Sequence, residues 1–292
     1  MIDTELNTTQ DLFQLFPLHN LREDSGSNAQ APYHVYDGTI ILVGGTASLK
    51  AVQALLNGEN LEAVRTTRNE ALISLWMCDF TQSSLGPHKI LYAGISVALD
   101  TVRPVRPRPR ALSDAVLMKP QVGVYFQGAW MDEVRAATYQ SEMLGLDVHL
   151  AQGGIIQDPA RRNMEFEFWD VNDGETLLSG RVRGRATTTT RPALALLRRF
   201  GLPGFLQVLR QPRFSLQVVA PGKGDETDCM LSKRTSNIYW QSQHAVTQDF
   251  NLQSDQLCLS NAVFPGVEFY PKFVERLEGF KMVYFLPGKP KG

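Results

Sequence analysis

Cysteine is scarce in this chain of 292 residues, and its charges leave almost no excess of one sign. The 3 cysteines, Cys78, Cys229 and Cys258, lie far apart and form no CxxC pair, so neither a disulfide framework nor a zinc site is predicted. Because 29 Lys and Arg balance 30 Asp and Glu, no global field attracts the protein to nucleic acid or an anionic membrane. A polyanion partner would therefore need a local basic patch.

Long hydrophobic runs are also missing. No apolar run reaches the roughly 18 residues that cross a bilayer. The first residues, MIDTELNTTQDLFQLFP, are acidic and polar, whereas a secretory signal is basic and then apolar. We therefore expect a cytoplasmic protein that makes no membrane contact. The content of 43% hydrophobic and 20% charged residues is that of a globular protein and excludes disorder, collagen and coiled coil.

The motifs of nucleotide, serine-nucleophile and metal enzymes are absent as well. The sequence contains no GxGxxG, no P-loop, no GxSxG and no HExxH. None of the 5 histidines lies within four residues of another, so no helix-borne metal pair is visible. The turn Gly44-Gly45-Thr46 lacks a third glycine and a lysine at Walker spacing. We expect no cofactor and no metal.

The residues that are present predict many strands and few helices. Two pairs of apolar runs, joined by a Gly86-Pro87 turn and by an Asp173-Gly174 turn, predict antiparallel hairpins. The elements do not follow a regular βαβα rhythm, which predicts an α+β fold with a large, mainly antiparallel sheet or barrel and short peripheral helices. The strands are expected at residues 39–43, 71–80, 90–99, 121–130, 164–169, 177–185, 214–219 and 281–286, and the helices at 48–56, 131–144 and 192–200.

Two segments stand apart from this pattern. Residues 1–30 are polar and predict an N-terminal arm before a single domain over residues 31–292. Residues 103–110 alternate arginine with proline, which predicts a polyproline-like surface loop. Its guanidinium groups could hold a carboxylate, a phosphate or an acidic partner segment. The alternative is a solvated connection, and the loop lacks the aromatic residues of a base-binding patch.

One set of motifs resembles a known family. The segment Leu85-Gly86-Pro87-His88-Lys89-Ile90-Leu91, then Asp132, Glu142 and Gly145-Leu146-Asp147-Val148-His149-Leu150-Ala151, is similar in order and spacing to the acetoacetate decarboxylase-like family over residues 35–190. The resemblance implies a closed or nearly closed, mainly antiparallel β-barrel-like sheet. It also implies a homo-oligomer.

The differences from the family lie at its chemical groups. The resemblance assigns the Schiff-base lysine and the lysine after it to Val148 and His149, and the strand glutamate to Ile90. Valine cannot form an imine. Lys89 is next to the glutamate position, but neighbouring side chains of a strand point to opposite faces, so Lys89 should not reach that site.

The resulting hypothesis is an enzyme of small-molecule metabolism that acts without a Schiff base. We expect Ile90, Val148 and Trp130 to bind a keto or polyketide-like substrate. The expected catalytic residues are His88, Glu142 and His149, which would move protons for cyclisation, dehydration, isomerisation or carbon–carbon cleavage.

Each catalytic residue has a plainer explanation. Either histidine could be a surface or a satisfied core imidazole, and Glu142 could pair with Arg135 or cap a backbone group. The alternative function is a catalytically inactive relative that binds a small molecule or serves as a scaffold.

Overall fold

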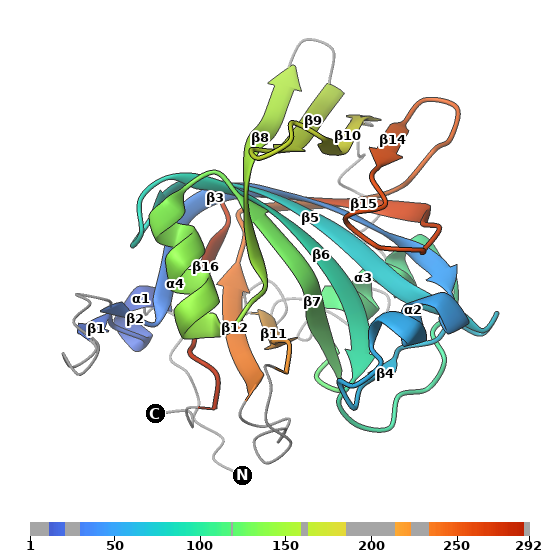
Figure 1. The fold of residues 1–292 in the computed structure, drawn as a ribbon, viewed down its shortest axis with the longest axis horizontal. Helices are drawn as coiled ribbons and strands as arrows, with labels where there is room; N and C mark the ends of the chain where they lie inside the picture. Colours follow the sequence, from blue (N-terminus) through green and yellow to red (C-terminus); the bar gives the residue numbers. More distant parts are fainter. Residues whose placement is uncertain are drawn as a thin grey trace, which may run out of the picture.

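The computed structural model describes residues 12–20, 30–117, 119–158, 163–184, 214–222 and 234–288. Long curved strands dominate it, with helices at their sides and a smaller group of strands above them (Figure 1). This agrees with the predicted fold class, a large sheet with short helices.

Four long strands form the centre of the main sheet. They are β3 (Tyr33–Ser48), β5 (Glu70–Ser83), β6 (His88–Ala98) and β7 (Val122–Met131), and each pairs antiparallel with the next. They are rich in β-branched and aromatic residues, which suit a pleated, buried surface. The predicted hairpin between β5 and β6 is confirmed.

Three further strands close these four into a ring. They are β11 (Phe214–Val219), β12 (Thr235–Gln241) and β16 (Lys281–Tyr284). β11 pairs parallel with β7, β12 lies between β11 and β16, and β16 pairs antiparallel with β3. Because β6 also pairs with β7, the pairings lead from β3 around to β3 again. Because β7 and β11 run parallel to each other, the sheet is mixed.

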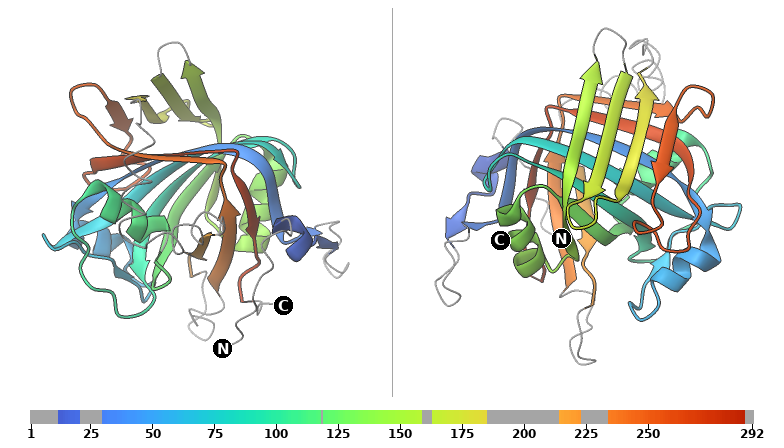
Figure 2. Two further views of the ribbon diagram at one scale, coloured as in Figure 1. Left: turned by 180° about the vertical axis from the view of Figure 1, so that it is seen from behind. Right: turned by 45° about the horizontal axis from the view of Figure 1, so that its top comes forward.

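A smaller sheet packs over the outside of this ring. It consists of β8 (Val148–Asp158), β9 (Asn163–Asp170), β10 (Thr176–Arg183) and β14 (Gln256–Leu259). The right view of Figure 2 shows these strands crossing the long strands of the main sheet. β8 belongs to both sheets, since its first residues pair with β7 and the rest pair with β9. The predicted β9–β10 hairpin is confirmed.

Several strands lie outside the sequence prediction. β15 (Tyr270–Glu278) pairs with β3 and with β13 (His244–Asp249), while β4 (Glu62–Ala63) pairs antiparallel with the end of β6. β1 (His19–Asn20) pairs with β2 (Gln30–Ala31). β13 is polar and mostly exposed, so it lacks the hydrophobic alternation by which a strand is predicted.

The helices are short. In the described residues they are α1 (Leu12–Leu15), α2 (Leu49–Leu55), α3 (Pro109–Leu117) and α4 (Val134–Leu144). None of these is long and apolar enough to span a membrane. The predicted helix at 192–200 lies outside the described residues.

Several predicted boundaries were wrong: the strand expected at residues 39–43 is β3, which is much longer, and two other boundaries fall where the type of element changes. The helix expected from residue 131 begins at Val134, because β7 continues to Met131 and pairs there with Ile90. The arginine–proline loop was expected to reach residue 110, but α3 begins at Pro109. Proline has no N–H to donate and has a helical φ, so it is well suited to the first turn of a helix.

The described part of the N-terminal segment lies against the ring. Leu12 is fully buried, Phe13 contacts the rings of His34 and Tyr36, and Phe16 stacks on Tyr239. The division into an arm of residues 1–30 and a domain of residues 31–292 remains a prediction.

Two hydrophobic clusters stabilise the two layers. The inner cluster takes one face of every ring strand, together with residues of α3 and α4, and therefore lies inside the ring. The outer cluster takes the other face of β3, β5, β6 and β7 and packs it against the small sheet. Successive residues of a ring strand thus point to different cores.

Candidate functional site

His88 lies at the start of β6 and points into the ring. Its side chain is 3% exposed. Nδ1 lies 2.8 Å from the carbonyl oxygen of Gly86, and Nε2 lies 2.8 Å from the hydroxyl oxygen of Tyr33. Because a carbonyl only accepts, Nδ1 must carry the proton, and Nε2 must accept from the Tyr33 hydroxyl. The turn that precedes β6 therefore fixes the tautomer of His88.

Burial keeps the His88–Tyr33 pair neutral. Loss of solvation lowers the pKa of His88, and the hydrogen bond to Gly86 opposes this only in part. Loss of solvation also raises the pKa of Tyr33 well above its usual value. Both shifts disfavour the charged form, so imidazole and phenol face each other uncharged at neutral pH.

Other polar side chains surround this pair inside the ring. The Tyr92 hydroxyl donates to Oε1 of Gln140 at 2.7 Å. The rings of Tyr139 and Tyr33 lie 6.0 Å apart. Tyr284 lies within electrostatic reach of Tyr92 and Tyr139, and desolvation raises the pKa of all three phenols. We call the set of Tyr33, His88, Tyr92, Tyr139, Gln140 and Tyr284 the ring polar cluster.

Three buried polar groups of the ring polar cluster lack a hydrogen-bond partner within the described part of the chain. They are the hydroxyls of Tyr139 and Tyr284 and the side-chain nitrogen of Gln140. Buried polar side chains nearly always have a partner, and an unpaired one costs about 1–3 kcal/mol. All three can donate a hydrogen bond. Each of them is therefore free to donate to an acceptor oxygen of a bound small molecule.

The predicted substrate-binding residues Ile90 and Val148 lie on the same side as His88. Ile90 is fully buried in the inner cluster, and Val148 packs against that cluster from the start of β8. Trp130 lies on the other side, because it pairs with Leu91 of the outer cluster. The structure therefore brings Ile90 and Val148, but not Trp130, to the ring interior.

His149 also lies away from the ring interior. Its side chain is 47% exposed, with Nε2 3.4 Å from Oδ2 of Asp147, and its ring stacks on Trp130. Since His149 follows Val148 along β8, it takes the opposite face. His88 and His149 are thus not brought together, and this geometry supports the surface-imidazole explanation of His149.

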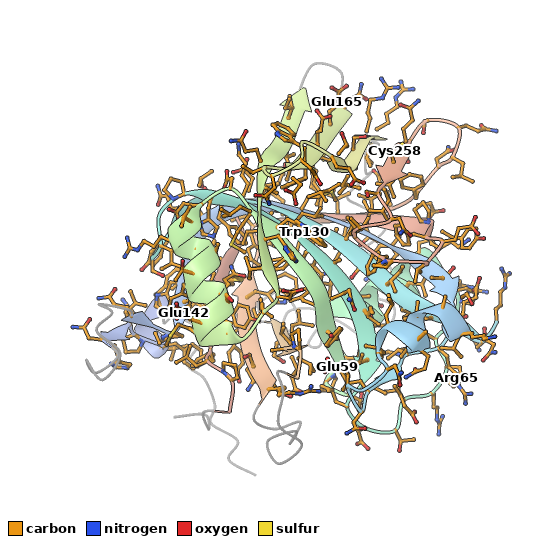
Figure 3. The ribbon with its side chains drawn as sticks, in the orientation of Figure 1. Glu59, Arg65, Trp130, Glu142, Glu165 and Cys258 are labelled. Atoms are coloured by element: carbon orange, nitrogen blue, oxygen red, sulfur yellow. The ribbon has the colours of Figure 1, made fainter. Side chains whose placement is uncertain are left out.

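Glu142 is an exposed residue of α4. The side of α4 that packs on the ring carries Tyr139 and Gln140, and Glu142 lies outside it. Figure 3 shows Glu142 on α4, away from Trp130. The structure therefore gives no contact between Glu142 and the other five predicted site residues, and a catalytic role for Glu142 is without geometric support.

An open cavity of about 1300 Å³ lies outside the ring beside the small sheet. Lys89 reaches it from β6, and the space that a Gly154 side chain would take lies 3.1 Å from the Lys89 ammonium. Asp79 lies opposite Lys89 on β5, and the Lys89 charge lowers the pKa of that carboxyl against the larger effect of burial. As predicted from strand alternation, Lys89 points away from Ile90.

Sequence reasoning found His88 but missed its neighbours. The sequence predicted Tyr139 and Gln140 only as part of a helix. Tyr33 and Tyr284 come from β3 and β16, which are far apart in the sequence and neighbours in the ring. The helical spacing of the buried face of α4 was the one signal for Tyr139. Tyr33 and Tyr284 become neighbours only through ring closure, which the sequence pattern does not contain.

The chain is similar in structure, though not in sequence, to known proteins. No family model matches the sequence, and no curated protein is significantly similar to it. Acetoacetate decarboxylase from Legionella pneumophila subsp. pneumophila str. Philadelphia 1 superposes with a TM-score of 0.55 at 10% identity, over 88% of this chain and 86% of that one. An acetoacetate decarboxylase-like enzyme from Sphingomonas wittichii RW1 gives 0.50 at 11% identity, over 92% and 96%. The chain therefore has the acetoacetate decarboxylase fold, as the sequence resemblance implied.

Proposed function

We propose that this protein is an enzyme that binds a small carbonyl compound inside the ring and moves protons through Tyr33 and His88 without forming an imine. The three unpaired donors of the ring polar cluster are the observation that carries the proposal. The acetoacetate decarboxylase fold of two enzymes with TM-scores of 0.55 and 0.50 is compatible with it.

The unpaired donors suit an oxygen that becomes negative. Two phenols and one amide nitrogen are buried beside the His88–Tyr33 pair. In a site without water, fixed donors stabilise an enolate oxygen far better than solvent does. The carbonyl oxygen of a keto substrate would accept from Tyr139, Gln140 or Tyr284.

The His88–Tyr33 pair suits the proton transfer. A proton next to the substrate carbonyl passes to the Tyr33 oxygen, while the Tyr33 proton passes to Nε2 of His88 along their 2.8 Å hydrogen bond. The electron pair left on the carbon moves to the carbonyl oxygen. The imidazolium and the enolate then balance in charge. Return of the proton to another carbon gives isomerisation, while its delivery through Tyr33 to a neighbouring hydroxyl, which then leaves as water, gives dehydration and restores neutral His88.

No lysine in the described part of the chain offers an amine for imine chemistry inside the ring. Among the described residues no lysine is buried, and Val148 occupies the position that the family resemblance gives to the Schiff-base lysine. Lys89, which directly precedes Ile90 in the chain, lines the outer cavity. This supports a mechanism that uses proton transfer alone.

The test is deuterium exchange into a panel of small keto acids and diketones, followed by proton NMR. We expect faster exchange than in buffer for one class, and loss of that exchange in Tyr33→Phe and His88→Gln. Tyr36→Phe is the matched control, because Tyr36 is on the same strand but outside the inner cluster. Exchange that survives both variants would contradict the proposal, as would a lysine adduct trapped by borohydride.

One observation favours a binding protein as the second candidate. Both ring nitrogens of His88 already have partners within the protein, as in a satisfied core histidine. Mass spectrometry of small molecules retained on purification separates the two functions. A retained ligand that wild type and Tyr33→Phe leave chemically unchanged would support the binding protein.

A further inference from the structure

Six arginines near one end of the ring have no part in the proposed reaction. Two follow β4, and four belong to the segment between β6 and the first turn of α3. All six are exposed. Figure 3 shows one of them, Arg65, at the edge of the molecule below α2. We call these residues the arginine face: Arg65, Arg68, Arg103, Arg106, Arg108 and Arg110.

Backbone hydrogen bonds hold the two segments of the arginine face together. The Val105 N–H donates to the Arg65 carbonyl, and the Thr67 N–H donates to the Val105 carbonyl, both at 2.9 Å. Thr66 and Val105 form a parallel bridge, and both are buried. Because side chains alternate along extended backbone, Arg65 and Arg106 point outward together.

The four loop arginines lie on backbone with little freedom. The Arg108 N–H donates to the Arg106 carbonyl at 2.7 Å, which makes a tight turn at Pro107. The helix that begins at Pro109 buries Leu112 in the inner cluster. Proline fixes φ, so the chain loses little further entropy when the guanidinium groups bind a partner.

The charge of the arginine face is not balanced locally. None of its members takes part in an ion pair of the described residues. Arg110 is partly compensated, since its charge opposes the burial effect that raises the pKa of Glu275. The formal net charge of the whole chain is −1, so the rest of the molecule is net acidic. Six positive charges are therefore gathered on exposed side chains of two adjoining segments, where they attract a negative partner.

We propose that the arginine face docks an acidic, Asp- or Glu-rich segment of a partner protein. Guanidinium groups bind carboxylates with two parallel hydrogen bonds, which a lysine cannot do. Single-stranded nucleic acid would need aromatic side chains for stacking, and residues 101–110 contain none. A membrane surface would need apolar side chains to insert, and none of the exposed large hydrophobic residues of the described chain belongs to this face.

The test is fluorescence anisotropy of a labelled oligoglutamate peptide with the full chain. We expect binding that weakens as ionic strength rises, and a loss of about tenfold in Arg103→Gln/Arg106→Gln/Arg108→Gln, from three exposed pairs. The matched control, with the same change of charge, is Arg135→Gln/Arg181→Gln/Arg183→Gln, three exposed arginines outside the face. It should bind within about twofold of wild type.

Four results would overturn this proposal. Equal loss in the two triple variants would mean that overall charge decides, and an oligoglutamine peptide that binds as well would remove charge from the explanation. Tighter binding of a single-stranded oligonucleotide or of phosphatidylserine vesicles would point to a different partner. A change in oligomeric state of the first triple variant, with peptide binding intact, would assign the face to a second copy of this chain.

Replacement of the same three residues by lysine should also weaken binding, since it keeps the charge and removes the paired hydrogen bonds.

Discussion

Two tyrosines of the ring interior should respond to loss of a hydroxyl in opposite directions. Tyr92 and Tyr284 are both buried in the inner cluster. The Tyr92 hydroxyl donates to Gln140 at 2.7 Å, whereas the Tyr284 hydroxyl has no partner in the described part of the chain. Phenylalanine keeps the ring at either position and removes only the oxygen. The pair of variants therefore compares a satisfied with an unsatisfied polar group.

The expected magnitudes follow from the cost of an unpaired buried group, about 1–3 kcal/mol. Tyr284→Phe removes such a group and should raise the free energy of unfolding by about that amount. Tyr92→Phe leaves Oε1 of Gln140 without its donor, so it should lower the free energy of unfolding by about 1–3 kcal/mol. At about 2–4 °C per kcal/mol for a chain of this size class, a change of about 2 kcal/mol shifts Tm by about 4–8 °C.

Urea unfolding followed by tryptophan fluorescence measures both variants, with the midpoint and the slope compared to wild type. Tyr284→Phe should also weaken binding of the carbonyl ligand, so stability and function should change in opposite directions. If Tyr284→Phe is destabilised as much as Tyr92→Phe, the Tyr284 hydroxyl is bonded in the folded protein and the argument from unpaired donors fails.

Three further predictions concern single sites. Gly153→Ala places a Cβ against the backbone of Glu167 at a φ of +154°. The control Gly58→Ala has open space at a φ of +88° and should lower the free energy of unfolding by about 1–2 kcal/mol. Gly153→Ala should lower it by more, and equal urea midpoints would contradict this. Burial raises the pKa of Glu275, so the folded state binds the proton more tightly than the unfolded state does. Stability therefore falls as pH rises from the unfolded to the folded pKa, by about 1.4 kcal/mol for each tenfold difference in proton affinity between the two states. Glu275→Gln should abolish that slope in pH-dependent urea unfolding, and a retained slope would assign it to another group. Glu133→Ala removes the oxygen that accepts from the Ala136 N–H at 2.6 Å at the start of α4 and should cost about 0.5–2 kcal/mol, whereas an unchanged midpoint would show that the cap contributes nothing.

The elements with strong local signals could be predicted from the sequence. The Gly86-Pro87 turn and the Asp173-Gly174 turn each join two apolar runs, and both hairpins are present. Ring closure could not be predicted, because β16 pairs with β3 from the far end of the chain and β7 meets β11 in parallel. Such contacts depend on tertiary packing, which leaves no periodicity in either strand alone.

The candidate site was predicted in part for the same reason. Strand alternation correctly places His88 with Ile90 and Lys89 on the other face. It also separates Val148 from His149, which the family resemblance had grouped together. The hydroxyl partner of His88 is Tyr33, which lies on β3 and approaches only because β5 and β6 fold back on it.

Ring closure by β16 has a consequence for synthesis. Tyr33 of β3 pairs with Tyr284 of β16, so the first strand of the ring to be synthesised has to wait for the last strand of the ring. During translation the early edge of β3 exposes unpaired N–H and C=O groups, which other chains can join. Closure across so large a sequence separation is also slow. Fresh chains are therefore most exposed to aggregation on the ribosome, and a chaperone that covers the β3 edge should raise the yield of soluble protein.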